Sequence, residues 1–486
     1  MTDQGSLYIN GQWINGNGKS FKSTDPYTEK VLWENQSASV DDVDNAIKAA
    51  GSTIWNTFSS EKRIEILKQF VTQLENNKDD FATTISQEMG KPKWESLTEV
   101  SAMIGKLNIS IEAFNTRCNE VSKPMGKAIS ITRFKPHGII AVFGPFNLPG
   151  HLPNGHIIPA LIAGNTIVFK PSEQTPLVGQ KYMELWDKTD IPAGVINMVQ
   201  GEKETGIAIA SHKDLNGLFF TGSYEVGRIL HKQFGGYPEK ILALEMGGNN
   251  PLIIWDVKNL EAAVYLTIQS AFITTGQRCV CARRLLLPDD SFSDKFIKLL
   301  IEKTKKIKIN HYSEKEEPFI GPLVSKEGAK NIIDQQSELV NNGSVALLPC
   351  HQDDKHSAII TPGIIDSTLN HSKKDHEIFG PLLQIFKVKT FEQAIDEANN
   401  TNFGLSAGII SDDQNKYDKF RQSSNAGILN WNRQITGASG AAPFGGSGYS
   451  GNHRPAAYLA ADYCSWPVAS IETSEIEIPE NTPPGL

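Results

Sequence analysis

The chain has 486 residues, of which 39% are hydrophobic and 21% charged, a composition typical of a globular protein with about two to four domains. Its formal net charge of −8 argues against a nucleic-acid-binding surface. The first residues lack the basic and apolar stretches of a signal peptide, and no apolar run is long enough to span a membrane, so we predict a cytoplasmic protein.

The cysteines are sparse and odd in number. They stand at positions 118, 279, 281, 350 and 464. This distribution favours a reducing compartment without a disulfide framework. Cys279 and Cys281 are too close together for ordinary zinc-ligand spacing, and no His/Cys pair stands nearby, so we predict no metal site.

The front of the chain is predicted to be a hairpin followed by helices. Residues 7–14 (LYINGQWI) carry an Asn-Gly pair between β-prone residues, which indicates a hairpin. Asp41 is predicted to cap a helix that runs to about Phe58. Further helical patterns cover 61–76, 78–89 and 93–117. Residues 128–136 show an alternating, β-branched pattern bracketed by Pro124 and Pro136, which favours an edge strand. This strand is either an arm that pairs with another subunit or a surface ribbon.

From Gly138 the pattern changes to short apolar strands that alternate with helices. The strands are GIIAVFG from 138, TIVFK at 166–170, VINMV at 195–199, GLFFT at 217–221 and ILALE at 241–245. Repeated βαβ units indicate a doubly wound parallel sheet, which binds ligands at the carboxyl ends of its strands. A second α/β region is predicted from about Pro251 to Asn430. The fold class is therefore predicted to be α/β.

The stretch 241–284 contains a carboxylate and a thiol suited to covalent catalysis. Glu245 ends a strand just before a Gly-Gly pair, and Cys279 follows the breaker Gly276. A thiolate can attack a carbonyl carbon, and a carboxylate can then activate water. By themselves these residues slightly favour a structural role, because a single cysteine is more often a small buried hydrophobe.

Polar residues after other strands suit an oxyanion and a nucleotide. Asn147 lies in a Pro- and Gly-rich loop and can present its amide to a developing oxyanion. Lys170 and Glu173 suit a ribose, and a carboxylate there would repel a 2′-phosphate, which favours NAD over NADP. The segment from Gly222 to Gly227 opens a helix whose N–H groups attract phosphate, although its spacing is not the usual dinucleotide fingerprint.

Glu377 and Phe379 precede a Gly-Pro pair after a charged loop. The carboxylate could contact a second ribose while the ring packs against a nicotinamide. Each of these motifs, taken alone, is explained as well or better by an ordinary turn, cap or surface pair.

Taken together, the motifs resemble the aldehyde dehydrogenase family over essentially the full length. The matching pieces are PFNLP at 145–149, FKPSE at 169–173, FTGS at 220–223, LEMGG at 244–248, GQRC at 276–279, EIFGP at 377–381, NFGLS at 402–406 and PFGGSGYSG at 443–451. Their order and spacing make the resemblance highly specific. The chain departs from the family at Asn249-Asn250, where most members carry a lysine after the Gly-Gly pair.

The resemblance implies an NAD-dependent aldehyde dehydrogenase. It makes Cys279 the nucleophile, Glu245 the general base, and Asn147 with the Cys279 backbone N–H the oxyanion hole. It assigns cofactor binding to Lys170, Glu173, Gly222, Ser223, Gly227, Gly247, Glu377 and Phe379. No catalytic role transfers to Cys281.

The resemblance also implies an arrangement of domains. Residues 1–120 and 138–247 are expected to form a Rossmann-like NAD-binding domain, and residues 248–451 a catalytic domain that is also doubly wound. Residues 121–137 and 452–486 are expected to form a small β oligomerisation arm and a tail that bridge the subunits of a homodimer or tetramer.

Within the family, the chain is most similar to members that oxidise a small acidic aldehyde, so its pocket should offer cationic or donor groups. Arg278, His151, His156 and Arg454 are candidates because they stand near the motifs, although each could equally be a structural hydrogen-bonder. Another acidic semialdehyde is an alternative substrate. A non-redox thioesterase that uses Cys279 and Glu245, and a binding protein without activity, are alternative functions.

Overall fold

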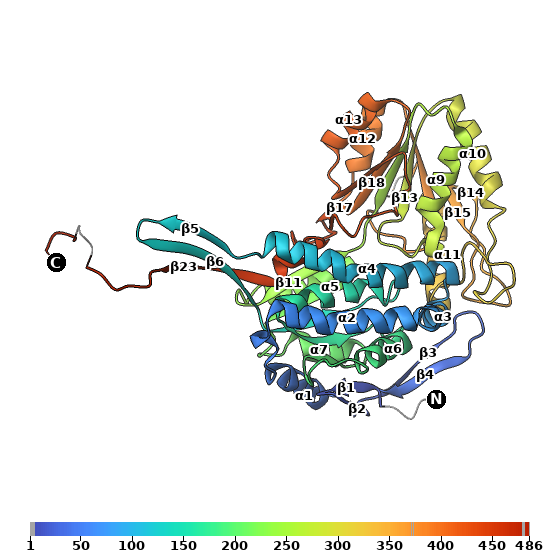
Figure 1. Cartoon of the computed structure of the whole chain (residues 1–486). Coiled ribbons are helices and arrows are strands. Elements are labelled where there is room, and N and C mark those ends of the chain that lie inside the picture. Colours follow the sequence, from blue (N-terminus) through green and yellow to red (C-terminus); the bar gives the residue numbers. More distant parts are fainter. Residues whose placement is uncertain (1–4, 371, 373, 479–481, 486) are drawn as a thin grey trace.

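The computed structural model describes residues 5–370, 372, 374–478 and 482–485. Part of the chain start (1–4) and part of the predicted tail (479–481 and 486) lie outside the described residues. The described chain contains a lower α/β unit, an upper α/β unit and a long β arm that projects to one side (Figure 1).

The lower unit is built on a seven-stranded sheet in the order β11-β10-β7-β8-β9-β1-β2. Its strands are β1 (Leu7–Ile9), β2 (Gln12–Ile14), β7 (Ile139–Phe143), β8 (Thr166–Lys170), β9 (Ile196–Met198), β10 (Gly217–Gly222) and β11 (Ile241–Met246). The strands from β7 to β11 are parallel, and the predicted hairpin β1–β2 adds antiparallel pairs at one edge. Every residue of β7 and β8 is buried, as expected for parallel strands that are covered on both faces.

Helices connect these strands and cover the sheet. They are α1 (Val40–Gly51), α2 (Ser60–Asn76), α3 (Lys78–Met89), α4 (Lys93–Arg117), α5 (His151–Ala163), α6 (Pro176–Trp186), α7 (Lys203–Ala210) and α8 (Tyr224–Phe234). β3 (Ser20–Thr24) and β4 (Val31–Gln36) form a separate small hairpin. In Figure 1, α4 runs along the side of the lower unit that faces the upper unit.

The predicted first helix is corrected at both ends. Its cap is Ser39 rather than Asp41, because the Ser39 hydroxyl accepts from the Asp42 N–H while the Asp42 carboxylate accepts from the Ser39 N–H. This reciprocal pair gives both backbone N–H groups a hydrogen-bond acceptor. A cap at Asp41 would leave these two donors without one. The helix ends at Gly51, and only a short 3₁₀ turn at Trp55–Thr57 occupies the rest of the predicted range.

The upper unit is built on a second seven-stranded sheet in the order β14-β15-β16-β13-β12-β18-β19. Its strands are β12 (Asn250–Ile254), β13 (Ala282–Pro288), β14 (Val345–Leu348), β15 (Gly363–Asp366), β16 (Leu382–Val388), β18 (Ser406–Ile410) and β19 (Ile428–Trp431). Its helices are α9 (Leu260–Phe272), α10 (Ser291–Thr304), α11 (Lys326–Asn341), α12 (Phe391–Asn399) and α13 (Gln414–Ser423). The two sheets with their connecting helices confirm the predicted α/β fold class.

The arm is a three-stranded sheet in the order β23-β6-β5. β5 (Val121–Met125) and β6 (Ala128–Pro136) form a hairpin, and β23 (Ser465–Glu472) pairs with β6 along its length. The predicted edge position of 128–136 is therefore wrong, because a strand from the far end of the sequence covers the second edge of β6. The functions of these units stay predictions.

Candidate active site

The candidate catalytic residues meet at the seam between the two large sheets. Glu245 lies near the carboxyl end of β11 in the lower sheet. Cys279 lies in the loop before β13 in the upper sheet, and its carbonyl accepts a hydrogen bond of 2.7 Å from the Asn250 side chain at the start of β12. The seam thus joins the carboxyl edge of one sheet to the amino edge of the other, whereas sequence reasoning expected ligands at carboxyl ends alone.

A strained turn precedes Cys279. Thr274 and Thr275 adopt left-handed backbone conformations with φ of 56° and 53°, which non-glycine residues rarely occupy. Gly276 follows with φ of +72°, and a Cβ there would lie 2.2 Å from the Gly380 carbonyl oxygen, so only glycine fits. Strain of this kind persists only where surrounding contacts fix the backbone, and it clusters at functional sites.

The Cys279 thiol is partly buried in an apolar corner. It packs against a small cluster formed by Val280, Leu405, Ile428 and Phe444. Burial raises the pKa of the thiol, and the nearby carboxylates of Glu377 and Glu245 raise it further. The resting side chain is therefore a thiol rather than a thiolate over the neutral pH range.

The Glu245 carboxylate is buried and only half satisfied. Its Oε1 accepts a 3.1 Å hydrogen bond from the Ala456 N–H, whereas Oε2 is buried without a partner among the described residues. Burial raises the pKa of Glu245 well above its usual value. A buried carboxyl with a free oxygen and a raised pKa is suited to accept a proton from water.

A short ladder links the surroundings of the thiol and the carboxylate. β20 (Pro443–Phe444) pairs with β22 (Ala456–Ala457), which places Phe444 opposite Ala456. Phe444 packs against the same apolar cluster as Cys279, and Ala456 donates to Glu245. Lys106 of α4 is buried and donates to the Ala457 carbonyl oxygen over 2.9 Å, which anchors this ladder to the lower unit.

Asn147 is held by contacts on both sides of the seam. The side chain is 4% exposed, and its amide donates to the Gln277 carbonyl oxygen over 2.8 Å. The Asn147 backbone carbonyl accepts from the Lys91 ammonium over 3.0 Å. An amide carries two N–H donors, so the second remains for an oxyanion beside Cys279.

The predicted ribose residues lie at the end of β8. The Lys170 ammonium is buried, donates to the Pro171 carbonyl oxygen over 3.2 Å and lies 3.5 Å from a Glu173 carboxylate oxygen. The Glu173 side chain is about half exposed, so its carboxylate is open to a ligand. In the sheet, β7 alone separates β8 from β10, whose end carries Gly222.

The predicted phosphate segment is a helix start. Ser223 caps α8 by accepting from the Val226 N–H. Gly227 lets α8 approach β11, because a Cβ there would lie 2.2 Å from the Met246 sulfur. Gly222 has no room for a side chain, since a Cβ would lie 2.4 Å from the Phe220 ring. The backbone N–H groups at the start of α8 lie at the carboxyl edge of the sheet, where they fit a pyrophosphate.

Glu377 and Phe379 lie beside the catalytic loop. A Cβ on Gly247 would lie 1.7 Å from a Glu377 carboxylate oxygen, so Gly247 creates the space for that carboxylate. Burial raises the pKa of Glu377 to about 7, although the Arg283 guanidinium opposes the shift. Arg283 also lies over the Phe379 ring, with 5.4 Å to its centroid. The site thus offers a shaped carboxylate and a ring beside the catalytic loop, which fits the nicotinamide end of a dinucleotide.

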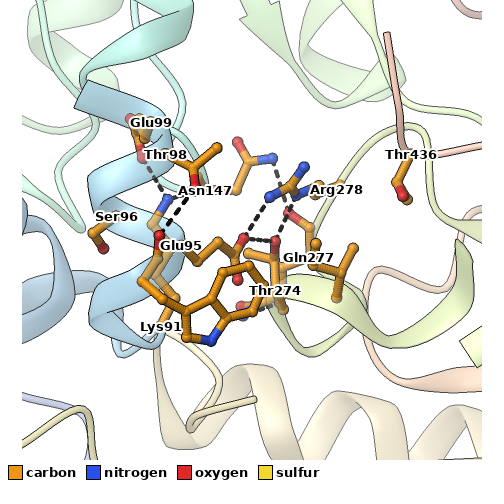
Figure 2. Close-up of polar contacts among 12 residues, drawn as sticks. Lys91, Glu95, Ser96, Thr98, Glu99, Asn147, Thr274, Gln277, Arg278 and Thr436 are labelled. Carbon is orange, nitrogen blue, oxygen red and sulfur yellow. Dashed lines mark hydrogen bonds and ion pairs between the residues drawn. The ribbon is translucent and has the colours of Figure 1, made fainter. Parts of the chain in front are cut away.

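Arg278 is the candidate substrate residue nearest the nucleophile. Its Nη2 donates to Glu95 over 2.7 Å and its Nε donates to the Thr274 hydroxyl over 2.6 Å (Figure 2). Its Nη1 has no partner among the described residues, so the two N–H donors of this nitrogen remain for a substrate.

His156 is buried, and His151 is partly buried. His156 is bonded at both ring nitrogens, to the Tyr463 hydroxyl at 2.8 Å and the Thr221 hydroxyl at 3.1 Å. Burial lowers the pKa of His156 to about 3 and that of His151 to about 4, so both rings are neutral. His151 Nδ1 is buried without a partner in the described part of the chain.

Arg454 lies apart from the catalytic loop. It lines a surface pocket with Ile241 and Leu242, at the start of β11, whereas Glu245 lies toward the end of that strand.

Cys281 is fully buried, and its thiol contacts the Ile273 carbonyl oxygen.

The structure adds residues that sequence reasoning missed. Asn250 is one, since its side chain also donates to the Cys281 carbonyl oxygen over 2.9 Å and so holds both ends of the catalytic turn. Others are the buried charges Lys91, Glu95 and Glu99 at the start of α4. Their spacing of four residues places them on one face of a helix, which was a usable signal.

Among the described residues, no His, Cys, Asp and Glu side chains form a group of at least three that could hold a metal ion. No described helix combines the length and apolar character needed to cross a membrane.

The fold brings a thiol, a buried carboxylate and an amide to one seam, and the comparisons show the class of protein to which the chain belongs. The chain matches the aldehyde dehydrogenase family model over residues 13–466, so it belongs to the aldehyde dehydrogenase family. It is 50% identical over 483 residues to the N-succinylglutamate 5-semialdehyde dehydrogenase of Pseudomonas fluorescens, which covers 99% of both chains. The enzyme of that name from Burkholderia ambifaria is 49% identical over 482 residues, again with 99% of both chains covered.

Solved structures have the same fold. An aldehyde dehydrogenase from Physcomitrella patens in complex with the reaction product succinate matches with a TM-score of 0.90 and 26% identity, over 97% of this chain and 99% of that one. A Bacillus halodurans glyceraldehyde-3-phosphate dehydrogenase complexed with NADP matches with a TM-score of 0.90 and 24% identity, over 97% and 100% of the chains. A Sinorhizobium meliloti structure complexed with NAD matches with a TM-score of 0.92 and 22% identity, over 98% and 99%.

The raised pKa of Cys279 predicts how the thiol reacts without cofactor. Because only the thiolate is alkylated, labelling by iodoacetamide should rise about tenfold per pH unit, with no plateau between about pH 7 and about pH 9. Mass spectrometry of the Cys279 peptide gives the rate, and Cys279→Ala reports labelling elsewhere. A plateau below about pH 8 would contradict the raised pKa.

Proposed function

We propose that this protein oxidises N-succinyl-L-glutamate 5-semialdehyde to N-succinyl-L-glutamate with NAD, as a step of arginine catabolism. The observation that carries the proposal is the convergence of Cys279, Asn147 and Glu245 at one seam, in a chain 50% identical to relatives of that name. The substrate is an aldehyde with two carboxylates, and the reaction yields one acid and NADH.

The residues of the chain account for each step of the proposed reaction. The Cys279 thiol gives up its proton to water, the thiolate sulfur adds to the aldehyde carbon, and the resulting oxyanion accepts from the free Asn147 amide N–H and from the Cys279 N–H. One such donor typically contributes a factor of about 10²–10³ to kcat. Bound NAD would supply the hydride acceptor, and loss of a hydride from the carbon would leave a thioester on Cys279. Glu245 then takes a proton from water, and the resulting hydroxide cleaves the thioester to release the acid and the thiol.

We propose NAD rather than NADP as the cofactor. Lys170 and Glu173 would bind the adenosine ribose, with Glu173 accepting from its hydroxyls. The exposed Glu173 carboxylate would repel a 2′-phosphate. Ser223 and the start of α8 would hold the pyrophosphate, and Glu377 with Phe379 would contact the nicotinamide side.

We propose that Arg278 binds one substrate carboxylate through its Nη1 and that His151 supplies a neutral hydrogen-bonding group. His156 is not included, since both its ring nitrogens are already bonded. Arg454 is not included either, because it lines a different pocket.

The units of the fold receive roles in the same proposal. Residues 1–120 and 138–247 would bind NAD, and residues 248–451 would carry the catalytic loop. The arm formed by 121–137 and 452–486 would bridge subunits of a homodimer or tetramer, which is supported by its exposed apolar side chains. These include Val121, Met125, Ile129, Trp466 and Ile471. A cytoplasmic location is supported by the free state of all five cysteines.

The proposal is tested by NADH formation from succinylglutamate semialdehyde. We expect turnover with NAD in the wild type and its loss in Cys279→Ala, because the sulfur is the attacking atom. Activity on a different acidic semialdehyde, without activity on this one, would mean that the proposed substrate is wrong. Thioester hydrolysis without NADH would support the thioesterase alternative, and NAD binding without any turnover would support a binding protein.

Glu245→Gln should separate hydride transfer from hydrolysis. We expect a burst of about one NADH per subunit and then slow turnover, because the thioester forms but no base activates water. The wild type needs the carboxylate form of Glu245, and burial raises the pKa of this group. Steady turnover should therefore decline with falling pH, and this decline should begin at a higher pH than for an ordinary carboxyl. The matched control is Glu261→Gln, which changes an exposed glutamate. Full steady turnover in Glu245→Gln would contradict this role.

Glu173→Gln should relax the choice of cofactor. Removing the carboxylate removes a like-charge repulsion, so kcat/KM with NADP should rise about tenfold relative to NAD. Steady-state kinetics with both cofactors measure the ratio, and the exposed Glu239→Gln is the control. An unchanged ratio would mean that Glu173 does not face the 2′ position.

A further inference from the structure

A buried charged cluster lies between α4 and the two catalytic loops (Figure 2). It consists of Lys91, just before α4, and Glu95 and Glu99 in its first turns. Their side chains are 1%, 0% and 0% exposed. Burying a charge costs several kcal/mol unless it is paired and hydrogen-bonded, so the contacts that these side chains make need an explanation.

Lys91 and Glu99 hold the loop that carries Asn147. Their side chains form an ion pair, and the Lys91 ammonium also donates to the Asn147 carbonyl oxygen over 3.0 Å. The second Glu99 oxygen accepts from the N–H groups of Gly150 and His151 over 2.8 and 2.9 Å. The loop is thus fixed at Asn147 and again at the start of α5.

Glu95 holds the loop that carries Cys279. One carboxylate oxygen accepts from Arg278 over 2.7 Å and from the Thr274 hydroxyl, which in turn accepts from Arg278 over 2.6 Å. This triangle spans the left-handed pair Thr274-Thr275. Left-handed conformations strain non-glycine residues, so they need outside contacts to persist. Glu95 supplies such contacts at both ends, because it contacts Thr274 in the strained pair and Arg278, the residue before Cys279.

The two loops meet at the oxyanion hole. The Asn147 amide donates to the Gln277 carbonyl oxygen over 2.8 Å, two residues before Cys279. An oxyanion hole works only if its donors are oriented before charge develops, and errors of about 0.5 Å matter. The proposed hole takes one donor from each loop, the Asn147 amide and the Cys279 N–H. The buried cluster contacts both loops.

We propose that Glu95, together with the Lys91–Glu99 pair, positions the Asn147 amide and the Cys279 N–H as one oxyanion hole. These are positioning residues, since they contact the two loops and not the reacting atoms. The inference rests on the proposed aldehyde oxidation. It predicts that Glu95 acts on catalysis through Asn147, so the effects of changing the two residues are not independent.

A double-mutant cycle tests this coupling. In the NADH assay, Asn147→Ala should lower kcat about 10²–10³-fold, and Glu95→Gln should lower it about 10–100-fold with little change in KM for NAD. In the Asn147→Ala background, Glu95→Gln should cost less than about threefold, because the hole is already lost. An equal loss in both backgrounds would mean a purely structural role and would overturn the inference.

Controls separate misfolding and failure of the proposed function from failure of this inference. Glu112→Gln makes the same change at an exposed position of α4 and should leave kcat unchanged. Circular dichroism and NAD binding, followed by protein fluorescence, report folding of each variant. A wild type without NADH formation from any aldehyde would reject the proposed function itself, whereas an active wild type with an uncoupled cycle would reject only the positioning role.

Thr274 provides a second test that leaves all charges in place. Thr274→Val keeps the shape but removes the hydroxyl between Glu95 and Arg278, and we expect about a tenfold loss of kcat. Thr274→Ser keeps the hydroxyl and should restore kcat to within about twofold of the wild type. Equal activity of the valine and serine variants would contradict a role for this contact.

Discussion

The burial of Glu245 beside Cys279 constrains the rest of the site. Burial raises the pKa values of both groups and leaves one Glu245 oxygen without a partner among the described residues. Water would stabilise both charged forms, so the structure has to hold two reactive groups in an unfavourable environment. The surrounding glycines, the β20–β22 ladder and the neighbouring loops all serve to fix these two side chains.

The fixing contacts cross from one sheet to the other. Ala456 donates to Glu245, and Lys106 of α4 holds the neighbouring Ala457, whereas Asn250 fixes Cys279 from the start of β12. α4 belongs to the lower unit, yet its Glu95 binds the loop of the upper unit. A site built in this way depends on how the two units dock, so a change in α4 can affect catalysis without touching the substrate.

Sequence reasoning found the strand ends and motif residues but missed much of their support. Cys279, Glu245 and Asn147 stood out because each lies in a short motif at an element boundary. The sequence pattern did not indicate a buried role for Glu95, because a charged residue in a helical pattern is normally exposed to solvent. The edge position of 128–136 was wrong for a similar reason, since the strand that covers it comes from the other end of the chain.

The sequence by itself determined the α/β class, the order of strands and helices, and the residues at their ends, because hydrophobic periodicity and turn chemistry act over a few neighbouring residues. The tertiary structure decided which of those ends meet. The contacts between Glu95 and Arg278 and between Asn147 and Gln277 join residues 183 and 130 positions apart. Such contacts form only when packing of the two units excludes water from the seam, and no local pattern encodes them.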